Sequence, residues 1–571
     1  MNKFNEIKTR NDLADFLDIP RSRLTYILYG KKIENFYTSF EILKKNGGTR
    51  QIDAPNKELK IVQKKIANAL WNHYKGLAKK TSSKTNFSHA FEKEKSIITN
   101  AKIHRNKRFV LNIDLEDFFH SFHFGRVRGF FEKNNNFTLP KEVATVMAQL
   151  VCYEKHLPQG APSSPIITNL ICNILDFRML KLSRKYKFDY TRYADDLTFS
   201  SNNKYFLEKH QEIYDEISNE IERAGFRINE RKTRLQYRDS KQQVTGLVVN
   251  KKINVDRVYY KKTRAMAFSL YSCGSFEIEG DQGSINQLEG RFAFINQLDR
   301  YNNKLSSEKN DFRTLNSREK QYQQFLYYKY FFANKKPLIV TEGKTDVRYL
   351  KAAMKSLCDE YPNLITKSSD TEFEFKVSFL RRTKRLNYFL NITQDGADTI
   401  SSIYKFSQAN NEKGYINYLE YFKKISNTNP KNPVILIFDN ELNGDQSKGK
   451  NNKNKPLQKF INLINLDNES HEKFKNSLSY NILGNFHLLT NQLVNNKDQC
   501  EIEDLIESKV WNNRIGGKTF SIDKEFDLDK HFGKEIFSQY IEQNYETIDF
   551  ENFKPILDNI SQIIDEYNVK S

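Results

Sequence analysis

Residues 191–200, Thr-Arg-Tyr-Ala-Asp-Asp-Leu-Thr-Phe-Ser, place two adjacent carboxylates between apolar, β-prone flanks. Such flanks predict two short strands that meet at a tight turn. Neighbouring side chains in an extended strand point to opposite faces, so Asp195 and Asp196 can share one function only if they lie at the bend. An Asp-Asp turn by itself is typical of a solvated hairpin tip. A chemical role therefore requires a third carboxylate and a nucleotide pocket elsewhere in the chain.

The composition favours a large protein that binds nucleic acid. A chain of 571 residues exceeds one ordinary core and predicts about three to four domains. Its net charge of +20 points to a polyanionic partner, first of all nucleic acid. No apolar stretch approaches the roughly 20 residues of a membrane span and no signal peptide is seen, so we expect no membrane partner. The five cysteines are widely spaced and indicate neither a disulfide frame nor a zinc site, which favours a reducing, cytoplasmic setting.

The third carboxylate follows a buried strand. Residues 109–113 (Phe-Val-Leu-Asn-Ile) are strand-like in length and branching, and Asp114 ends the run. An unpaired buried carboxylate is costly, so an acid at the mouth of a buried strand suggests a bound cation. Asp114, Asp195 and Asp196 together are the set needed to hold two Mg²⁺ ions, which prefer hard oxygen ligands. Two such ions lower the barrier to attack by a 3′ oxygen on the α-phosphate of a nucleotide.

Two further segments have features of a nucleotide pocket. Residues 37–53 alternate apolar and polar around a basic Gly-Gly turn, which predicts a hairpin that suits a triphosphate or is simply solvated. The loop 157–165 is stiffened by prolines, and Gly160 allows the backbone to approach a flat ligand closely. Residues 1–36 predict two short helices, with a packing extension favoured over a nucleic-acid-binding element.

In this order the segments resemble the palm motifs of reverse transcriptases. The matching segments are Asp114 at its strand end, Leu157-Pro158-Gln159-Gly160, Tyr193-Ala194-Asp195-Asp196, and Gly225-Phe226 to Lys232. Two signatures narrow the resemblance to retron reverse transcriptases: Asn100-Ala101-Lys102-Ile103-His104 matches Asn-Ala-x-x-His, and Val244-Thr245-Gly246 matches Val-Thr-Gly. The resemblance implies a multidomain α+β right-hand polymerase, with a helical extension (1–36), fingers and palm (37–250) and a helical thumb (251–333).

The same resemblance implies roles for single residues. It makes Asp114, Asp195 and Asp196 the metal ligands and places Lys232 where the family offers a proton donor to pyrophosphate. Residues that would line the nucleotide are Lys45, Arg50, Gln159, Gly160 and Phe119, the last at the position that excludes a ribose 2′-OH. Candidate RNA contacts are Asn100, His104, Arg105, Lys107, Arg108, Val244, Thr245 and Gly246, with a solvated, basic strand entry as the alternative.

The resemblance also implies partners. Retron enzymes bind a dedicated structured non-coding RNA, prime from a 2′-OH within it and leave a branched RNA–DNA product. The expected partners are therefore that RNA, its cDNA in an RNA–DNA hybrid, and dNTPs. Retron assemblies are often multimeric, so a homo-oligomer is an expectation as well, although no heptad pattern specifies a number of subunits.

Residues 334–571 predict a second, α/β domain. A strand at 337–341 runs into Glu342, and a strand at 434–438 ends in Asp439-Asn440-Glu441. Acids at the carboxyl ends of parallel strands gather in one crevice. Glu342, Asp439 and Glu441 are thus candidate ligands for one or two further Mg²⁺ ions. Three acids near the start of a later helix are possible extra ligands, although a solvated helix start is favoured for them: Glu501, Glu503 and Asp504.

This second arrangement resembles the TOPRIM fold, which has a Glu-Gly turn after its first strand and an Asp-x-Asp motif after a later one. Glu441 departs from the second acid of that motif. The resemblance implies a Mg²⁺-dependent nuclease that acts on nucleic acid, with Glu342 in its catalytic site and a helical cap at the C-terminal end. The leading interpretation is a retron reverse transcriptase fused to a TOPRIM nuclease effector, a context that suggests anti-phage defence.

Two alternatives remain. An intron-type reverse transcriptase is disfavoured by the two retron signatures at Asn100–His104 and Val244–Gly246. The second alternative is a polymerase whose C-terminal half is a metal-free scaffold for RNA and partner chains. A nuclease assay on a Glu342 variant separates the scaffold from the enzyme.

Overall fold

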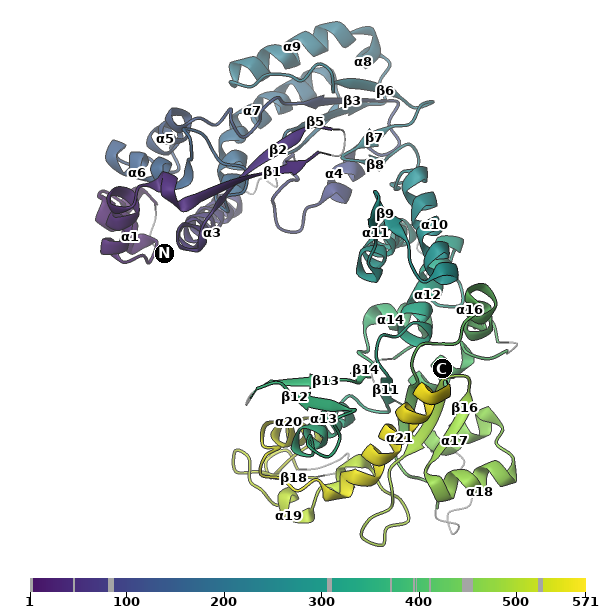
Figure 1. Ribbon diagram of the computed structural model, residues 1–571. Coiled ribbons are helices and arrows are strands. Elements are labelled where there is room, and N and C mark those ends of the chain that lie inside the picture. The colour runs from purple at the N-terminus through teal and green to yellow at the C-terminus, as the bar shows by residue number, and fades with distance from the viewer. Residues whose placement is uncertain are drawn as a thin grey trace. The chain divides into compact units, whose positions relative to one another are not determined.

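The computed structural model describes residues 4–44, 47–80, 87–305, 311–369, 372–393, 396, 398–409, 412–443, 455–521 and 527–570. The chain divides into two compact units, Met1–Arg257 and Val258–Ser571, and each is described by itself (Figure 1). Within the described residues, no helix is both long and apolar enough to cross a membrane.

The first unit is built on a four-stranded antiparallel sheet with strand order β4-β5-β3-β6 (Figure 1). Its strands are β3 (Phe109–Asp114), β4 (Asp189–Tyr193), β5 (Asp196–Ser201) and β6 (Arg234–Tyr237). Alternate residues of β3, such as Leu111 and Ile113, are buried in the core of the unit, as the period of a strand requires. The register places Asp114 of β3 opposite Asp196 of β5.

Helices cover this sheet and complete the core. Helix α7 (Ser164–Tyr186) has a proline in its first turn and stops where Lys187 adopts a left-handed conformation with φ 55°. Helix α9 (His210–Arg223) packs on α7 and buries Ile213, Ile217 and Ile221, four residues apart on one face. The other helices are α1 (Arg10–Phe16), α2 (Arg21–Thr25), α3 (Lys57–Lys80), α4 (Ile97–Ile103), α5 (Phe124–Lys133), α6 (Lys141–Val151) and α8 (Tyr205–Glu208).

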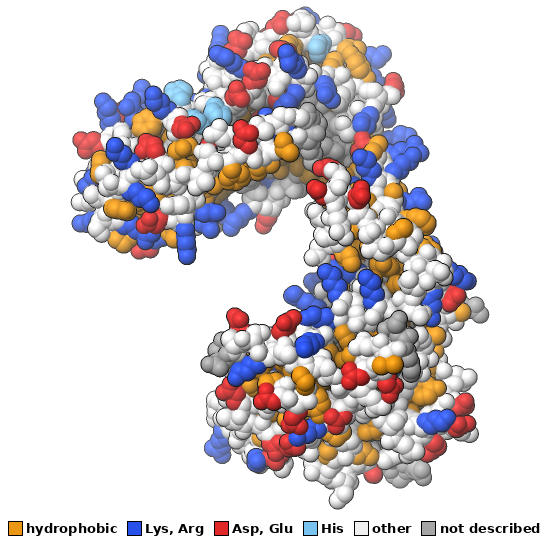
Figure 2. Space-filling model, in the orientation of Figure 1, with side chains coloured by type: hydrophobic (Ala, Val, Ile, Leu, Met, Phe, Trp, Pro, Cys, Tyr) orange, Lys and Arg blue, Asp and Glu red, His pale blue; other side chains and the backbone are white. Residues whose placement is uncertain are grey.

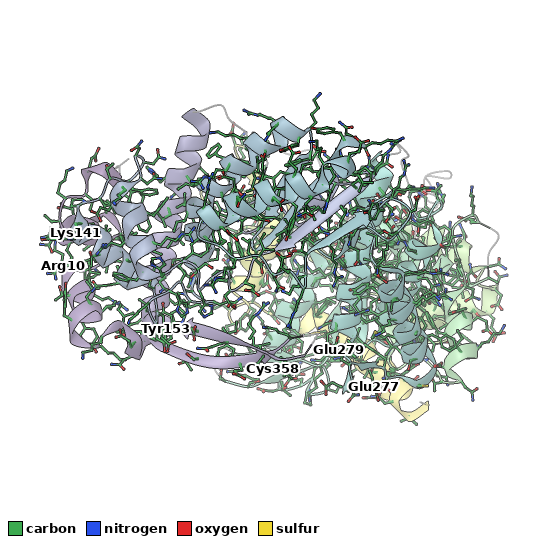
Figure 3. All side chains as sticks on the ribbon, turned by 90° about the horizontal axis from the view of Figure 1, so that it is seen from above. Arg10, Lys141, Tyr153, Glu277, Glu279 and Cys358 are labelled. Atoms are coloured by element: carbon green, nitrogen blue, oxygen red, sulfur yellow. The ribbon has the colours of Figure 1, made fainter. Side chains whose placement is uncertain are left out.

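Two hairpins flank the sheet. The hairpin predicted at 37–53 is formed by β1 (Tyr37–Leu43) and β2 (Thr49–Pro55). Tyr37 stacks on Tyr153, with 4.4 Å between ring centroids, and Figure 3 shows Tyr153 beside the base of the hairpin. The second hairpin joins β7 (Gln243–Val244) to β8 (Leu247–Val248). Its two turn residues, Thr245 and Gly246, have φ of 46° and 80°, the double left-handed turn that matches strand twist.

The second unit is an α/β fold around a five-stranded sheet of order β14-β11-β15-β17-β16, parallel except for β16 (Figure 1). The strands are β11 (Leu338–Thr341), β14 (Ser378–Phe379), β15 (Val434–Phe438), β16 (Ser479–Leu483) and β17 (Phe486–Thr490). Along β15, Val434 and Leu436 belong to one core, whereas Ile435 and Ile437 belong to another. Both faces are therefore covered, as in other parallel sheets.

Helices of the second unit supply these two cores. On one face lie α13 (Asp346–Ser356), α19 (Ser508–Trp511), α20 (Lys534–Gln543) and α21 (Lys554–Lys570). Helix α21, yellow in Figure 1, packs on β17. The other core takes residues from α14 (Lys384–Leu390), α15 (Asp398–Lys405), α16 (Tyr418–Ser426), α17 (Pro456–Ile464) and α18 (Asn468–Ser477). Short hairpins are β9 (Glu277–Ile278) with β10 (Asp281–Gln282) and β12 (Ile365–Lys367) with β13 (Phe373–Phe375), and β18 (Thr519–Phe520) pairs in parallel with β19 (His531–Phe532).

The helices expected as a thumb share a core with this sheet. They are α10 (Arg257–Cys273), α11 (Ile285–Leu305) and α12 (Ser317–Tyr327), followed by a π-helical turn at Tyr328–Phe332. The ring of Phe422 on α16 lies 4.9 Å from that of Tyr271 and 5.0 Å from that of Tyr328. The side chain of Gln323 donates a hydrogen bond to the carbonyl of Phe389 at 2.7 Å. The sequence predicts a domain boundary between residues 333 and 334, but buried aromatic rings join the segments on both sides of it.

Candidate functional sites

The β4–β5 turn holds Asp195 and Asp196 next to Asp114. Tyr193 pairs with Asp196 across a two-residue turn in which Ala194 has φ 57°. Asp114 lies opposite Asp196, and the backbone N–H of Leu115 donates to the carbonyl of Asp195 at 3.0 Å. The three acids that are far apart in sequence are thus neighbours at one end of the sheet.

Burial and mutual repulsion raise the pKa of both turn carboxyls. Burial, followed by the charges of Asp195 and Asp114, raises the pKa of Asp196 to about 7. Burial, with a contribution from Asp114, also raises the pKa of Asp195, and the charge of Arg50 opposes this. Lys232 Nζ lies 2.9 Å from Oδ1 of Asp114, and this hydrogen bond raises the pKa of Lys232. Crowded carboxylates of this kind favour the binding of additional positive charge.

The donor chemistry at this turn fits Mg²⁺, because all three groups are hard carboxylate oxygens. Across the described residues, no three His, Cys, Asp or Glu side chains are already arranged as a metal site. At this turn Lys232 contacts both oxygens of Asp114, at 2.9 and 3.2 Å. Lys232 and a metal ion would therefore share the carboxylate oxygens of Asp114.

The residues expected to line a nucleotide lie on three different segments. Arg50 is an exposed residue of β2, and Phe119 is half-buried with its ring edge-on to Phe118 at 5.5 Å. Gly160 has φ 135°, and a Cβ there would lie 2.8 Å from the carbonyl oxygen of Asp53. Packing on β2 therefore requires glycine at this position. Gln159 is half-buried, its carbonyl accepts from the N–H of Asp53 at 3.0 Å, and Lys45 lies outside the described residues.

The two signature segments pack against each other, since α4 contacts both β7 and β8. His104 is fully buried, with Nδ1 2.7 Å from Oγ of Ser200 and Nε2 2.7 Å from Oγ1 of Thr191. Asn100 and Val244 are fully buried as well. The expectation of direct RNA contacts is therefore corrected for Asn100, His104 and Val244, whose side chains do not reach the surface. His104 instead joins β4 to β5 just behind the acidic turn.

The other candidate RNA contacts are more accessible. Arg108 is exposed, and Gly246 is exposed at the tip of the β7–β8 hairpin beside half-buried Thr245. Arg105 is half-buried, and Lys107 forms an ion pair with Asp189. These residues remain candidates for contact with a phosphate backbone.

His104 makes the stability of the first unit depend on pH. Burial lowers the pKa of His104 to about 3, so the folded state keeps the ring neutral where the unfolded chain takes up a proton. Stability is thus lost as pH falls below the unfolded value of about 6.5, by about 2 kcal/mol between pH 6.5 and 5. Urea unfolding followed by the fluorescence of Trp71, in a Trp511→Phe background, measures this. The His104→Gln variant should show a correspondingly smaller loss, and an equal loss in both proteins would contradict the assignment.

A buried ion pair supports the turn, and the sequence interpretation missed it. Arg192 on β4 donates to Asp176 on α7 through Nε at 2.9 Å and an Nη atom at 2.8 Å, and both side chains are fully buried. The hydroxyl of Tyr190 donates to the same carboxylate at 2.7 Å. The other Nη of Arg192 donates to the carbonyl of Ala194 at 3.3 Å. The sequence did contain one indication of this pair, because Arg192 is a charged residue within an otherwise apolar, β-prone run.

The second unit places acids at the carboxyl ends of two paired parallel strands. Glu342 follows β11 and Asp439 follows β15. The N–H of Asp439 donates to Glu342 Oε1 at 3.3 Å. Glu441 Oε2 accepts from the N–H of Leu457 at 3.3 Å, at the start of α17. We call this edge of the sheet the acidic crevice.

Further acids lie at the acidic crevice. Two of them, Glu503 and Asp504, are buried, so the expectation of a solvated helix start is wrong for them. Glu503 and Asp504 are 1% and 5% exposed. The pairing of Asn440 with Cys500 brings this segment to β15, and the N–H of Ile502 donates to Asp439 Oδ1 at 3.0 Å. Charged partners of these acids are Lys534, 2.8 Å from Glu501 and 3.3 Å from Glu503, and Lys497, 2.7 Å from Asp504. Asp346 on α13 also belongs here, and its carboxylate accepts from the N–H of Gly343 at 2.8 Å.

Electrostatics in the acidic crevice again favour a cation. Burial, followed by the charges of Glu441 and Asp346, raises the pKa of Glu342 to about 8. Burial raises the pKa of Glu503 to about 7, and one of its oxygens, Oε1, has no hydrogen-bond partner among the described residues. The donor set is suited to Mg²⁺ in its chemistry, although the described side chains do not form a ready metal site here either.

Comparisons with known proteins place the chain in a family. The family model described as reverse transcriptase (RNA-dependent DNA polymerase) matches residues 42–254. The retron Ec86 reverse transcriptase of Escherichia coli is 38% identical over 235 residues, which cover 41% of this chain and 69% of that protein. The retron Mx162 and Mx65 reverse transcriptases of Myxococcus xanthus are each 31% identical, over 52% and 51% of this chain and 65% and 68% of their own lengths.

Among solved structures, an apo telomerase of Candida tropicalis truncated from its C-terminal domain is similar with a TM-score of 0.30 and 17% identity. That match covers 39% of this chain and 56% of the telomerase chain. The family assignment rests on the retron reverse transcriptases, because the chain covers 69% of the Ec86 enzyme at 38% identity and 68% of the Mx65 enzyme at 31% identity. The chain belongs to the retron reverse transcriptase family.

Proposed function

We propose that this chain reverse-transcribes a cognate structured non-coding RNA into a branched RNA–DNA product, and that its second unit is a Mg²⁺-dependent nuclease of the TOPRIM type. In this proposal the nuclease is an effector in anti-phage defence. The observation that carries the polymerase half is the meeting of Asp114, Asp195 and Asp196 at the β4–β5 turn, in a chain of this family.

At the polymerase site Asp114, Asp195 and Asp196 would hold two Mg²⁺ ions. When bound, such ions activate the 3′ oxygen and stabilise the charge of the leaving pyrophosphate. Lys232, whose ammonium group lies 2.9 Å from Asp114, would be the proton donor to the pyrophosphate. Arg50, whose charge already acts on Asp195, would neutralise the triphosphate, and the half-buried ring of Phe119 would exclude a ribose 2′-OH.

The RNA partner would be held by the basic surface of the first unit. Structured RNA is recognised mainly through its shape, phosphates and 2′-hydroxyls. Exposed Arg108 and the tip of the β7–β8 hairpin are suited to such contacts, since both are accessible. The buried residues of the two signature segments would hold the β7–β8 hairpin in place, because α4 packs on both of its strands.

The acidic crevice carries the nuclease half of the proposal. Glu342, Asp439 and Glu441 would hold one or two Mg²⁺ ions, together with Asp346 and Glu503. Parallel strands that open into a crevice at their carboxyl ends are where α/β sheets place their ligands. Lys534 supplies the balancing positive charge. Its pKa is lowered by burial but raised more by Glu503 and Glu501, so the ammonium group persists at neutral pH.

The test is a cleavage assay with Mg²⁺ on single-stranded and structured DNA and RNA. Glu342→Gln keeps the shape of the side chain and removes its charge, so we expect cleavage to fall by at least about 10²-fold. Glu469→Gln is the matched control, because Glu469 is exposed on α18, where it pairs with Lys473 on the surface. Equal cleavage by wild type and Glu342→Gln would refute the role of Glu342. Absence of cleavage in all proteins, including chain freed of bound nucleic acid, would favour the scaffold alternative.

A further inference from the structure

A cavity of about 670 Å³ lies beside the acidic crevice, on the side of β11 that pairs with β14. Its wall is formed by β11, the start of α13 and β14, and by the residues that follow β14. Thr341 and Gly343, which flank Glu342, both line it. Its size falls within the range of pockets that hold small ligands. The cavity is therefore the space next to the candidate nuclease site.

The lining of this cavity is basic. Lys344, Lys351, Arg381 and Arg382 line it, and none of its described lining residues is acidic. Arg381 is exposed and makes no ion pair within the described part of the chain. Lys344 is paired with Glu535 at 3.1 Å. Figure 2 shows Lys and Arg side chains gathered on the visible face around α14 and β14. This concentration of cations next to an acidic crevice suits an anionic ligand that spans both.

Two aromatic rings form part of the same wall. Phe375 and Phe379 are edge to face, with centroids 6.4 Å apart and planes at 79°. Lys351 Nζ lies 5.8 Å from the first centroid and 5.4 Å from the second, so the ammonium group is held against the rings. Both phenylalanines are only half-buried. Accessible rings beside flexible cations are the combination that binds unpaired bases and their phosphates.

A third feature links the cavity to Glu342. A guanidinium nitrogen of Arg382 donates to the carbonyl of Glu342 at 2.8 Å and also contacts the carbonyl of Thr341. The Glu342-Gly343 turn is fixed from the other side by Asp346, whose carboxylate would lie 2.8 Å from a Cβ at Gly343. Hydrogen bonds thus connect the cavity wall directly to the acid-bearing turn. A ligand in the cavity would hold a defined position relative to Glu342.

We propose that this cavity binds one nucleotide of an unpaired nucleic-acid strand and so positions the neighbouring phosphodiester at the acidic crevice. Its phosphate lies against Lys351 and Arg381, and its base lies against Phe375 or Phe379. The inference rests on the proposed nuclease function and specifies its substrate as a strand with accessible bases. A duplex does not fit this description, because its bases are stacked and paired and do not offer a free face.

The experiment is photocrosslinking of the full chain, followed by mass spectrometry of the peptide that contains residues 373–382. The probes are single strands of about 12 nucleotides of DNA or RNA carrying 5-iodouracil, the same strands annealed to complements, and free 8-azido-ATP. We expect crosslinks to Phe375 or Phe379 with one or both single strands. A crosslink with DNA alone or RNA alone identifies the sugar that is preferred.

The variants separate binding from cleavage. The double variant Lys351→Gln/Arg381→Gln should lower the crosslink yield on the order of tenfold, whereas Lys384→Gln, an exposed lysine of α14 outside the cavity, should not. Phe375→Leu, which keeps an apolar side chain, should lower it to a similar degree. Fluorescence of Trp511 verifies that the second unit is folded. Glu342→Gln should keep the crosslink, so loss of cleavage with retained crosslinking would leave the cavity assignment intact.

Three results would overturn the proposal. One is an unchanged crosslink yield in both the double variant and Phe375→Leu. Another is crosslinking by the duplex as strong as by the single strands. The third is crosslinking by free 8-azido-ATP alone, which would make the cavity a site for a small nucleotide.

Discussion

Replacing Asp195 with asparagine is expected to abolish cDNA synthesis, with a loss of at least about 10³-fold in primer extension. Asparagine keeps the size of the side chain and removes the charge that would hold Mg²⁺ beside Asp114 and Asp196. The turn itself should persist, because its hydrogen bond to Leu115 is made by the backbone of residue 195. The measurement is dNTP incorporation on an RNA template by the purified chain.

The control for this prediction is Asp215→Asn, since Asp215 is an exposed residue of α9. We expect it to extend primers at the wild-type rate. Nucleic acid that copurifies with each protein from cells provides a second readout. A branched RNA–DNA species should accompany wild type and Asp215→Asn and be absent from Asp195→Asn. Synthesis within about tenfold of wild type by Asp195→Asn would remove Asp195 from the metal ligands.

Arg192→Met is expected to lower the free energy of unfolding of the first unit by about 3–5 kcal/mol. The substitution leaves the Asp176 carboxylate buried without its cation, and among the described residues only the hydroxyl of Tyr190 still donates to it. It also removes the hydrogen bond to Ala194 that supports the acidic turn. The chain has two tryptophans, Trp71 and Trp511, one in each unit. Urea unfolding of the Trp511→Phe background, followed by Trp71 fluorescence, therefore reports on the first unit.

A second substitution tests whether the unpaired charge is the cause. Asp176→Leu combined with Arg192→Met removes both charges, and we expect it to recover most of the lost stability. Arg223→Met serves as the control, because Arg223 forms an exposed pair with Glu220 that is worth at most about 1 kcal/mol. If Arg192→Met costs no more than Arg223→Met, the buried pair does not stabilise the unit.

Much of the candidate site could be predicted from short-range patterns. Period-two alternation and turn residues are local properties, so the β4–β5 turn with Asp195 and Asp196 and the acid-ended strand at Asp114 could be located without any contact information. The same holds for Glu342 and Asp439, because a short apolar run followed by an acid identifies the end of a buried strand. Each of these elements is present in the structure at the expected residues.

Burial of polar side chains could not be predicted in this way, because it depends on which distant segments pack together. Asn100 and His104 look like surface residues in a basic stretch, yet both are buried, because α4 packs on β4 and on the β7–β8 hairpin and the ring of His104 hydrogen-bonds to residues of β4 and β5. Glu503 looks solvated, but the pairing of Asn440 with Cys500 carries it into the acidic crevice. The ion pair between Asp176 and Arg192 could not be predicted either, because it forms only where α7 packs on β4.

The grouping of segments into folding units was likewise a matter of tertiary contacts. The sequence predicts a domain boundary between residues 333 and 334, but Tyr271 and Tyr328 before that point share a core with Phe422 after it. Hydrophobic burial is non-directional, so an apolar helix face does not specify its partner in the sequence. The acidic β4–β5 turn and its two carboxylates could therefore be predicted from the ten residues 191–200. Its support by Arg192 and His104, and the basic, aromatic cavity beside Glu342, arise only when strands and helices from distant parts of the chain are packed together.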